Sequence, residues 1–257
     1  MVTDYVVETI AGTPVPLEAF HPKRRVAFVV QGAGATLSPS FDMMVDCLVQ
    51  RGYNDIVAVR DAPHVFCRER RNLHEEHIVG LLKDLAKELS PDDVLFTAIL
   101  GASYTTNGAV YLSIPRSSSA ISALEIRDLL SRIPVHHAVH YVSPDVHAGA
   151  FARYLSQAEH LDLGNRHIAI APTLPDVSAS SYAHRVPKGQ HQSVDVVTPF
   201  HAAFFDLVDK PSLEARFRDA ATYQRRYRTE VQAYMRHGAV DPQEIAFRPT
   251  LVVKRQY

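Results

Sequence analysis

One serine of the chain follows an apolar run in a turn that partly matches a nucleophile elbow. Gly101 and Ser103 match the first glycine and the serine of a Gly-x-Ser-x-Gly turn, and they directly follow an apolar run at 94–100. Such a turn exposes its serine between a strand and a helix. Here Thr105 replaces the second glycine, and the next residues form another strand-like run. The sequence therefore favours a polar loop at the end of the strand over a nucleophile elbow.

A second glycine-rich turn offers a different chemistry, the binding of a phosphate group. Gly32-Ala33-Gly34 follows an apolar run at 25–30 and precedes a helical pattern, which is where dinucleotide-binding folds hold phosphates. The third glycine of that pattern would stand at Leu37. Tight turns between strand and helix also use glycine without any ligand. A nucleotide-binding module through Gly32–Gly34 is kept as an alternative.

The cysteines and histidines of the chain predict no metal site and no cofactor. Cys47 and Cys67 have no CxxC spacing, and the 14 histidines are scattered. Three arginines near Cys67 would favour its thiolate, although a cysteine without special role is the expectation. His140 lies inside an apolar run, where a histidine usually belongs to the core. His147 lies in a loop at the end of that run, where α/β folds bind ligands.

Composition excludes several classes of partner. Lys+Arg 27 against Asp+Glu 28 gives no field of one sign that would attract nucleic acid or an anionic membrane. No apolar run approaches the roughly 20 residues that a membrane-spanning helix needs, and the first residues have no signal-peptide pattern. We therefore expect a cytoplasmic protein that binds neither nucleic acid nor membrane.

The elements that would position these residues alternate between strands and helices. The patterns predict buried strands at 25–30, 56–59, 94–100, 138–142 and 167–171, amphipathic helices at 38–51, 78–89, 122–133 and 151–157, and a hairpin around Asn107-Gly108. The segment 60–72 is predicted as a polar loop. Helices are also predicted at 198–207 and 213–236, followed by an extended segment at 245–254.

This alternation predicts an α/β fold of three layers, with a mainly parallel sheet flanked by helices. The length of 257 residues suits one main core. We divide the chain into an N-terminal arm at 1–22, an α/β core at 23–210, and a C-terminal helical and strand extension at 211–257 packed on the core.

The order of these elements resembles that of the caspase/legumain-like cysteine peptidases, particularly the legumain branch, over roughly Val26 to Asp209. In that family the third strand ends in a catalytic His-Gly, and Ala102 stands at the corresponding histidine position. The fourth strand of the family ends in Cys-x-Ser-Gly or a close variant. Aligning the glycine on Gly149 places the nucleophile at Val146, or at Asp145 if the loop is shifted by one residue.

Two further features bear on the resemblance. The spacing from Ala102 to Val146 is close to the roughly 50 residues typical of caspase signatures. The run ending Ser180-Ser181-Tyr182-Ala183 is similar to a legumain segment that shapes the substrate pocket, whereas the pocket arginine of legumains falls near Ser40. The family spacing is thus kept without its catalytic histidine and cysteine, and alanine and valine can neither accept a proton nor attack a carbonyl.

Three hypotheses follow. The first is a catalytically inactive caspase/legumain-like pseudo-peptidase that acts as a binding, scaffolding or regulatory subunit for a peptide or protein, such as an active homologue or a second copy. Its candidate cleft contains Gly101, Ser103, Ser143, Asp145, His147, Gly149 and Ser181. The second is a hydrolase or other enzyme that reuses this cleft through Ser103, Asp145 or His147. The third is the nucleotide-binding module at Gly32–Gly34.

Overall fold

The protein is described from a computed structural model. The structure describes residues 6–10, 22–32, 37–61, 64–101, 103–114, 120–135, 137–142, 166–171, 184–187, 194–197, 204–205, 217–222 and 250–254.

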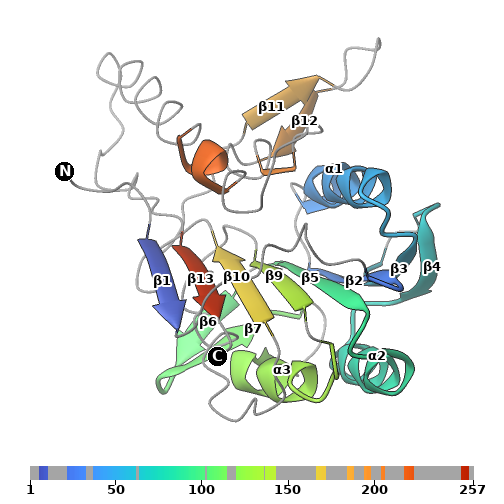
Figure 1. Cartoon of the computed structure of the whole chain (residues 1–257). Coiled ribbons are helices and arrows are strands. Elements are labelled where there is room, and N and C mark those ends of the chain that lie inside the picture. Colours follow the sequence, from blue (N-terminus) through green and yellow to red (C-terminus); the bar gives the residue numbers. More distant parts are fainter. Residues whose placement is uncertain are drawn as a thin grey trace.

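A large, mainly parallel sheet forms the centre of the fold (Figure 1). Its eight strands lie in the order β1-β13-β10-β9-β5-β2-β3-β4. Neighbours from β10 to β4 are parallel, β13 is antiparallel to β10, and β1 pairs in parallel with β13. The strands are β1 (Val6–Ile10), β2 (Arg25–Gln31), β3 (Asp55–Val59), β4 (Cys67–Arg71), β5 (Val94–Leu100), β9 (His137–Val142), β10 (Arg166–Ala171) and β13 (Thr250–Lys254).

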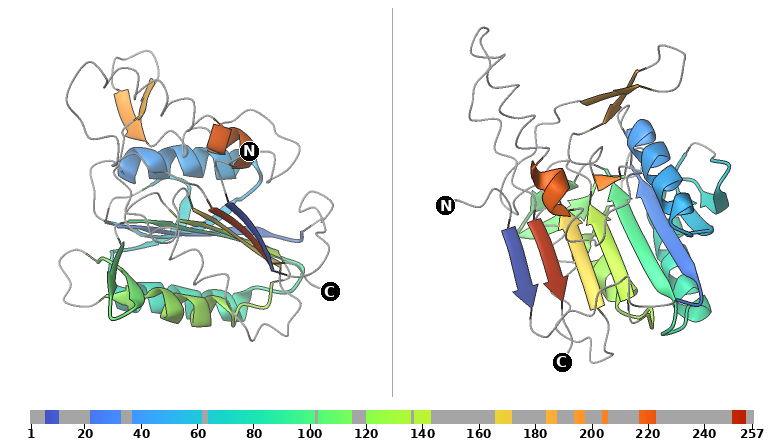
Figure 2. Two further views of the ribbon diagram at one scale, coloured as in Figure 1. Left: turned by 90° about the vertical axis from the view of Figure 1, so that its left-hand side faces the viewer. Right: turned by 45° about the horizontal axis from the view of Figure 1, so that its top comes forward.

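The helices cover both faces of this sheet, which confirms the predicted α/β class. Helix α1 (Leu37–Gln50) lies on one face, and α2 (Glu75–Glu88) and α3 (Ala123–Leu130) lie on the other (Figure 2). Because successive strand residues point to opposite faces, β2 contributes Val26, Phe28 and Val30 to the core under α2 and α3. Its alternate residues Ala27 and Val29 enter the core under α1.

Local sequence accounts for the ends of these helices. Helix α3 begins at a capping serine, because the Ser122 hydroxyl accepts a hydrogen bond from the Glu125 backbone N–H at 3.1 Å. Gly52, which follows the end of α1, has a φ of 82°, a left-handed conformation that glycine adopts without strain. Helix α3 therefore begins next to the predicted start at 122, and α1 ends next to the predicted end at 51.

Two small sheets accompany the main one. The first has the order β6-β7-β8 and contains β6 (Ser103–Thr106), β7 (Ala109–Leu112) and β8 (Ile121–Ser122). Its first turn is Asn107-Gly108, with φ values of 50° and 75°, as expected for a two-residue hairpin turn. The second small sheet pairs β11 (His184–Pro187) with β12 (Val194–Val197).

One strand of the main sheet lies in a segment that was predicted as a loop. The segment 60–72, predicted as a polar loop, contains the edge strand β4. After Cys67 every residue of β4 is charged, so a hydrophobicity pattern does not detect the strand. Charge also protects a sheet edge from pairing with other chains.

The ends of the described chain meet in the main sheet. Strands β1 and β13, from the predicted arm and the predicted extension, are neighbours there. The predicted domain boundaries at 22/23 and 210/211 stay predictions. The predicted helix at 151–157 lies outside the described residues, and within 213–236 the structure describes a helical segment at 217–222.

None of the helices in the described ranges combines the length and the apolar character needed to cross a bilayer.

Candidate functional site

The carboxyl ends of the parallel strands form the edge of the sheet where α/β folds usually bind ligands. From β2 the chain passes through α1 to β3, which lies beside β2 on the side away from β5. From β5 it passes through α3, on the opposite face, to β9, which lies beside β5 on the side away from β2. The connections that leave β2 and β5 therefore run in opposite directions, which makes this the topological switch point of the sheet.

Two glycines close the sheet at the switch point. The Gly32 backbone N–H donates to the Leu100 carbonyl, which extends the β2–β5 pairing by one residue. A Cβ atom on Gly32 would lie 3.0 Å from the Gly101 Cα, and one on Gly101 would lie 3.2 Å from a Leu112 methyl group. Close backbone packing therefore explains Gly32 without a ligand, and its N–H is already used. Gly34, the other glycine of the phosphate-binding hypothesis, lies outside the described residues.

Ser103 lies next to this closure but not in a nucleophile elbow. It is the first residue of β6, pairs with Leu112 of β7, and is 7% exposed. The sequence analysis expected a polar loop here, and the structure has a strand instead. Because β6 rather than a helix follows the turn, the strand–turn–helix geometry that exposes a serine is absent at Ser103.

Most of the predicted cleft lies outside the described residues. This applies to both vestigial dyad positions and to five other members: Ala102, Val146, Ser143, Asp145, His147, Gly149 and Ser181. The strands that lead to them are described. Strands β5 and β9 are hydrogen-bonded neighbours, with Ile99 opposite Val142, so both end at the same edge.

A cluster of polar residues that the sequence analysis missed lies at the end of β3. Arg60 directly follows β3, and its side chain is 3% exposed. Its guanidinium carbon lies 3.8 Å from the centre of the Phe41 ring of α1. Its Nη1 atom lies 3.6 Å from the Asp42 carboxylate, which is also 3.5 Å from His64 Nε2. A charged residue directly after an apolar strand was the available signal.

The backbone around Arg60 is held by its neighbours. The Arg60 N–H donates to the Arg71 carbonyl at 2.8 Å. The Arg70 guanidinium donates to the carbonyls of Arg60 and Asp61 at 3.2 and 2.9 Å. Burial lowers the pKa of Arg60, and the Asp42 carboxylate opposes that shift. Burial likewise lowers the pKa of His64, which favours its neutral form.

Burial is the main influence on the pKa values of Cys67 and His140. Burial raises the pKa of Cys67 more than Arg60 and Arg70 lower it, so the expected stabilisation of a thiolate does not prevail. His140 of β9 is 1% exposed, and desolvation lowers its pKa to about 4. It is a neutral core histidine, as predicted. Within the described ranges, no group of three or more His, Cys, Asp or Glu side chains could hold a metal ion.

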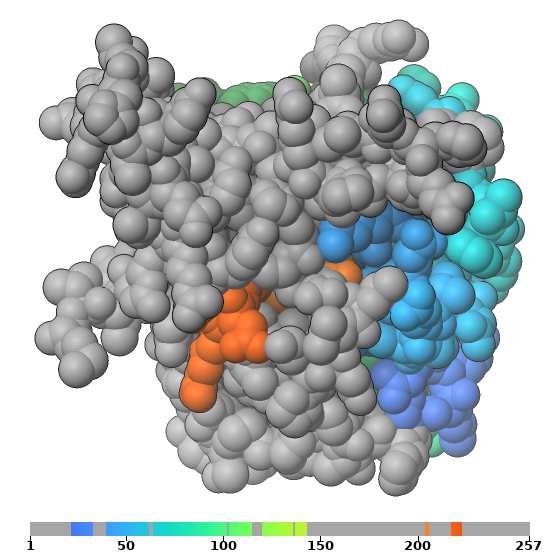
Figure 3. All heavy atoms as spheres, turned by 90° about the horizontal axis from the view of Figure 1, so that it is seen from above, coloured from blue at the N-terminus to red at the C-terminus, as the bar shows by residue number. Residues whose placement is uncertain are grey.

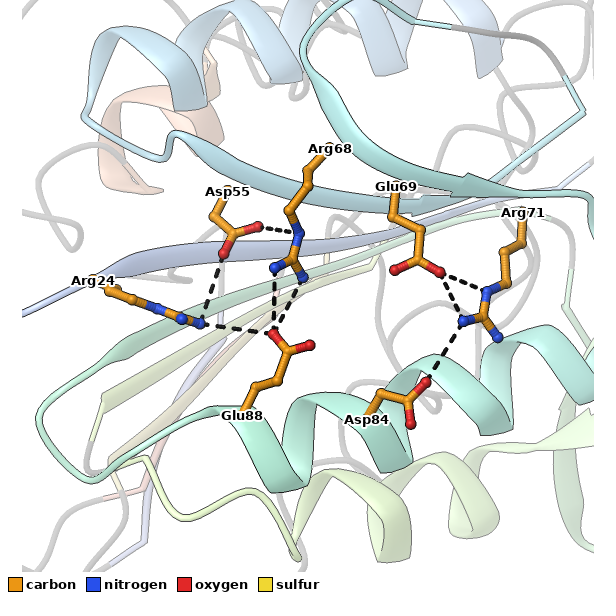
Figure 4. A network of polar contacts seen from close by, with 7 residues as sticks. All are labelled: Arg24, Asp55, Arg68, Glu69, Arg71, Asp84 and Glu88. Carbon is orange, nitrogen blue, oxygen red and sulfur yellow. Dashed lines mark hydrogen bonds and ion pairs between the residues drawn. The ribbon is translucent and has the colours of Figure 1, made fainter.

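A contrasting charge network lies near the amino ends of β2, β3 and β4 (Figure 4). The Arg68 side chain contacts Asp55 at 2.8 Å and Glu88 at 3.3 Å, and Arg24 contacts the same two carboxylates at 3.7 and 4.0 Å. All four side chains are partly exposed. This network pairs two cations with two anions and serves to tie α2 to the sheet.

Comparison with known proteins supports the fold and gives no family. No family model matches the sequence, and no curated protein matches it. The structure is similar to that of protein GSU0716 from Geobacter sulfurreducens, with a TM-score of 0.51, 10% identity, and coverage of 91% of this chain and 94% of the other. A match to a hypothetical protein, SMU.573 from Streptococcus mutans, has 12% identity, coverage of 91% of each chain and a TM-score of 0.27, too low to support an argument. The chain shares an α/β architecture with the first of these proteins.

Proposed function

We propose that the protein is a catalytically inactive caspase/legumain-like pseudo-peptidase that binds a peptide or protein segment at the carboxyl edge of its sheet. The observation that carries the proposal is the adjacency of β5 and β9, whose ends lie side by side. The residues that the resemblance assigns to the catalytic dyad follow these two strands in the sequence. Ala102 follows β5, and Val146 follows β9, so neither strand end is succeeded by the histidine or cysteine of an active peptidase.

The hairpin after β5 adds support. In the family that the sequence resembles, the strand before the catalytic histidine is followed by a loop and a short strand that forms a wall of the ligand site. Here β5 leads into β6 and β7, and Tyr104 stacks on Tyr111 across that hairpin with ring centres 5.6 Å apart. Tyr104 is 42% exposed. This partly exposed aromatic pair offers a rigid apolar surface to a bound peptide.

Peptide selection combined with an activity assay tests the proposal. Peptides selected on the wild-type protein from a display library should bind without being cleaved, and a bulky side chain introduced by Ala102→Trp should abolish binding. Lys87→Trp, at an exposed site near the end of α2 on the opposite edge, should leave binding unchanged. Equal binding by Ala102→Trp and wild type would contradict the proposed site.

Activity decides between the pseudo-peptidase and an enzyme that reuses the cleft. The selected peptides and fluorogenic substrates with Asn or Asp before the scissile bond should remain intact with the wild-type protein. Cleavage that Ser103→Ala or Asp145→Ala abolishes would overturn the proposal in favour of the enzyme hypothesis. A cytoplasmic location and a homologous or identical partner remain part of the proposal.

A further inference from the structure

Arg60 is a buried cation with unused hydrogen-bond donors. Within the described part of the chain, neither its Nε nor its Nη1 atom has a hydrogen-bond partner. The N–H groups of a guanidinium lie in its plane, so stacking on Phe41 covers a face without satisfying the donors. The nearest carboxylate, that of Asp42, lies at 3.6 Å and is shared with His64. Arg60 therefore has an ion-pair partner but incomplete hydrogen bonding.

Such an arrangement is costly for a residue with a structural role only. Leaving a buried donor without an acceptor costs roughly 1–3 kcal/mol, and more for a charged group. A buried arginine that served only to stabilise the fold would be expected to donate hydrogen bonds to a carboxylate, as Arg68 does with both Nη atoms to Glu88 at 3.3 Å. The difference leaves Arg60, among the described residues, with donors that a ligand could use.

The surroundings of Arg60 favour a negative charge. Helix α1 follows β2 and runs back to the start of β3, so its amino end lies at the carboxyl edge, and Phe41 belongs to its second turn. The positive end of the helix dipole and the guanidinium therefore act in the same direction. His64, with its lowered pKa, adds a neutral ring that can donate or accept a hydrogen bond.

Asp42 is the most exposed of the three side chains in the Arg60 cluster. Its side chain is 35% exposed, whereas Arg60 and His64 are 3% and 13% exposed. A carboxylate on the rim of the cluster can rotate toward water and leave its position beside the guanidinium to another anion. Asp42 then acts as an internal competitor of that anion.

We infer that Arg60, Asp42 and His64 form a binding site for an oxyanion, either a carboxylate or a phosphate group, in which Asp42 occupies the anion position when no ligand is bound. The site does not depend on the proposed function, because it lies at the end of β3, separated by β2 from the β5–β9 edge. Its failure would leave the peptide-binding proposal untouched.

Calorimetric titration of the whole protein with inorganic phosphate and, separately, with acetate tests the inference. Asp42→Asn should bind at least one of these anions about tenfold more tightly than the wild type, because the internal competitor loses its charge. Arg60→Met should lower the affinity about tenfold or more. The anion that gains more from Asp42→Asn identifies whether the natural ligand carries a phosphate or a carboxylate.

Arg68→Met is the matched control, since it removes an arginine that already has close carboxylate partners, and its anion affinity should equal that of the wild type. Circular dichroism establishes that each variant is folded, and Asp42→Asn tests the inference even if Arg60→Met does not fold. Unchanged or weaker anion binding by Asp42→Asn would show that Arg60 and Asp42 are only a structural ion pair.

Discussion

The arginines at the two edges of the sheet differ in burial and in the number of carboxylates that they contact. At the amino edge, Arg68 and Arg24 share two carboxylates on partly exposed side chains (Figure 4). At the carboxyl edge, Arg60 is almost completely buried with a single carboxylate at 3.6 Å. Each arginine of the first arrangement contacts two carboxylates, whereas Arg60 contacts one. Paired charges at a surface hold elements together, whereas an incompletely bonded buried charge at a strand end indicates a site.

Helix α1 and the late segment 217–222 share one face of the molecule. Viewed from above, α1 lies in the same face as the helical segment 217–222 (Figure 3). Phe217 and Ala220 of that segment pack into the core under α1 together with Phe41, the residue that stacks on Arg60. The environment of Arg60 thus depends on contacts from both early and late parts of the chain.

The largest expected effect is the pH dependence of the free energy of unfolding. It tests whether His140, a buried polar residue of β9 between the two edges, destabilises the fold. Unfolded His140 titrates near 6.5, whereas its folded pKa is about 4. The unfolded chain therefore binds more protons between these values, and the free energy of unfolding should fall by about 3 kcal/mol as the pH decreases from 6.5 to 4. Urea denaturation at several pH values measures this.

His140→Leu is the control for that titration. Removing the imidazole should abolish most of the loss between pH 6.5 and 4, and the remainder should include a contribution from His64, whose pKa burial also lowers. If His140→Leu keeps the full pH dependence of the wild type, desolvation of His140 is not its cause.

A smaller effect is expected at the closure of the carboxyl edge. Gly32→Ala would place a methyl group 3.0 Å from the Gly101 Cα, a backbone atom that cannot move aside, and should lower the free energy of unfolding by about 2 kcal/mol. Gly108→Ala, with φ 75° and no atom within 4 Å of its added carbon, should lower it by only about 1 kcal/mol through backbone strain. Equal losses of unfolding free energy for the two variants in denaturant titrations would mean that β2 and β5 are not closely packed at Gly32.

The smallest effect compares the two arginines directly. Arg60→Met replaces a buried, incompletely bonded cation by an apolar chain of similar length and should raise the free energy of unfolding by about 1 kcal/mol. Arg68→Met removes partly exposed ion pairs and should lower it by about 0.5 kcal/mol. Thermal and urea unfolding of both variants provide the measurement. If Arg60→Met lowers the free energy of unfolding more than Arg68→Met does, the distinction between the two edges is lost.

The sequence was sufficient to predict the central elements because their patterns are strong. Continuous apolar runs marked β2, β5 and β9, and the Asn107-Gly108 pair marked a hairpin turn. Strand β4 was not predicted because it is charged and its neighbours along the chain are polar. Its place at the sheet edge comes from pairing with β3, a contact that no local pattern encodes.

The candidate site shows the same division. Gly101 and Ser103 were correctly expected beside the end of a buried strand, since their position follows from the chain alone. The Arg60 cluster was missed because it joins residues of α1, the end of β3 and the segment before β4. Which charged residues meet at a strand end depends on how far each is buried, and burial is a property of the folded molecule.

The pairing of β1 with β13 has a consequence for how the protein is made. Val6 lies opposite Thr250, so β1 cannot pair in the main sheet until β13 has been synthesised. Ribosomes add about 5–20 residues per second, which leaves β1 without its partner for tens of seconds. During that interval β10 also has an open side, because β13 lies between it and β1. Nascent chains of this protein therefore leave strand edges accessible to chaperones and to one another until β13 has been synthesised.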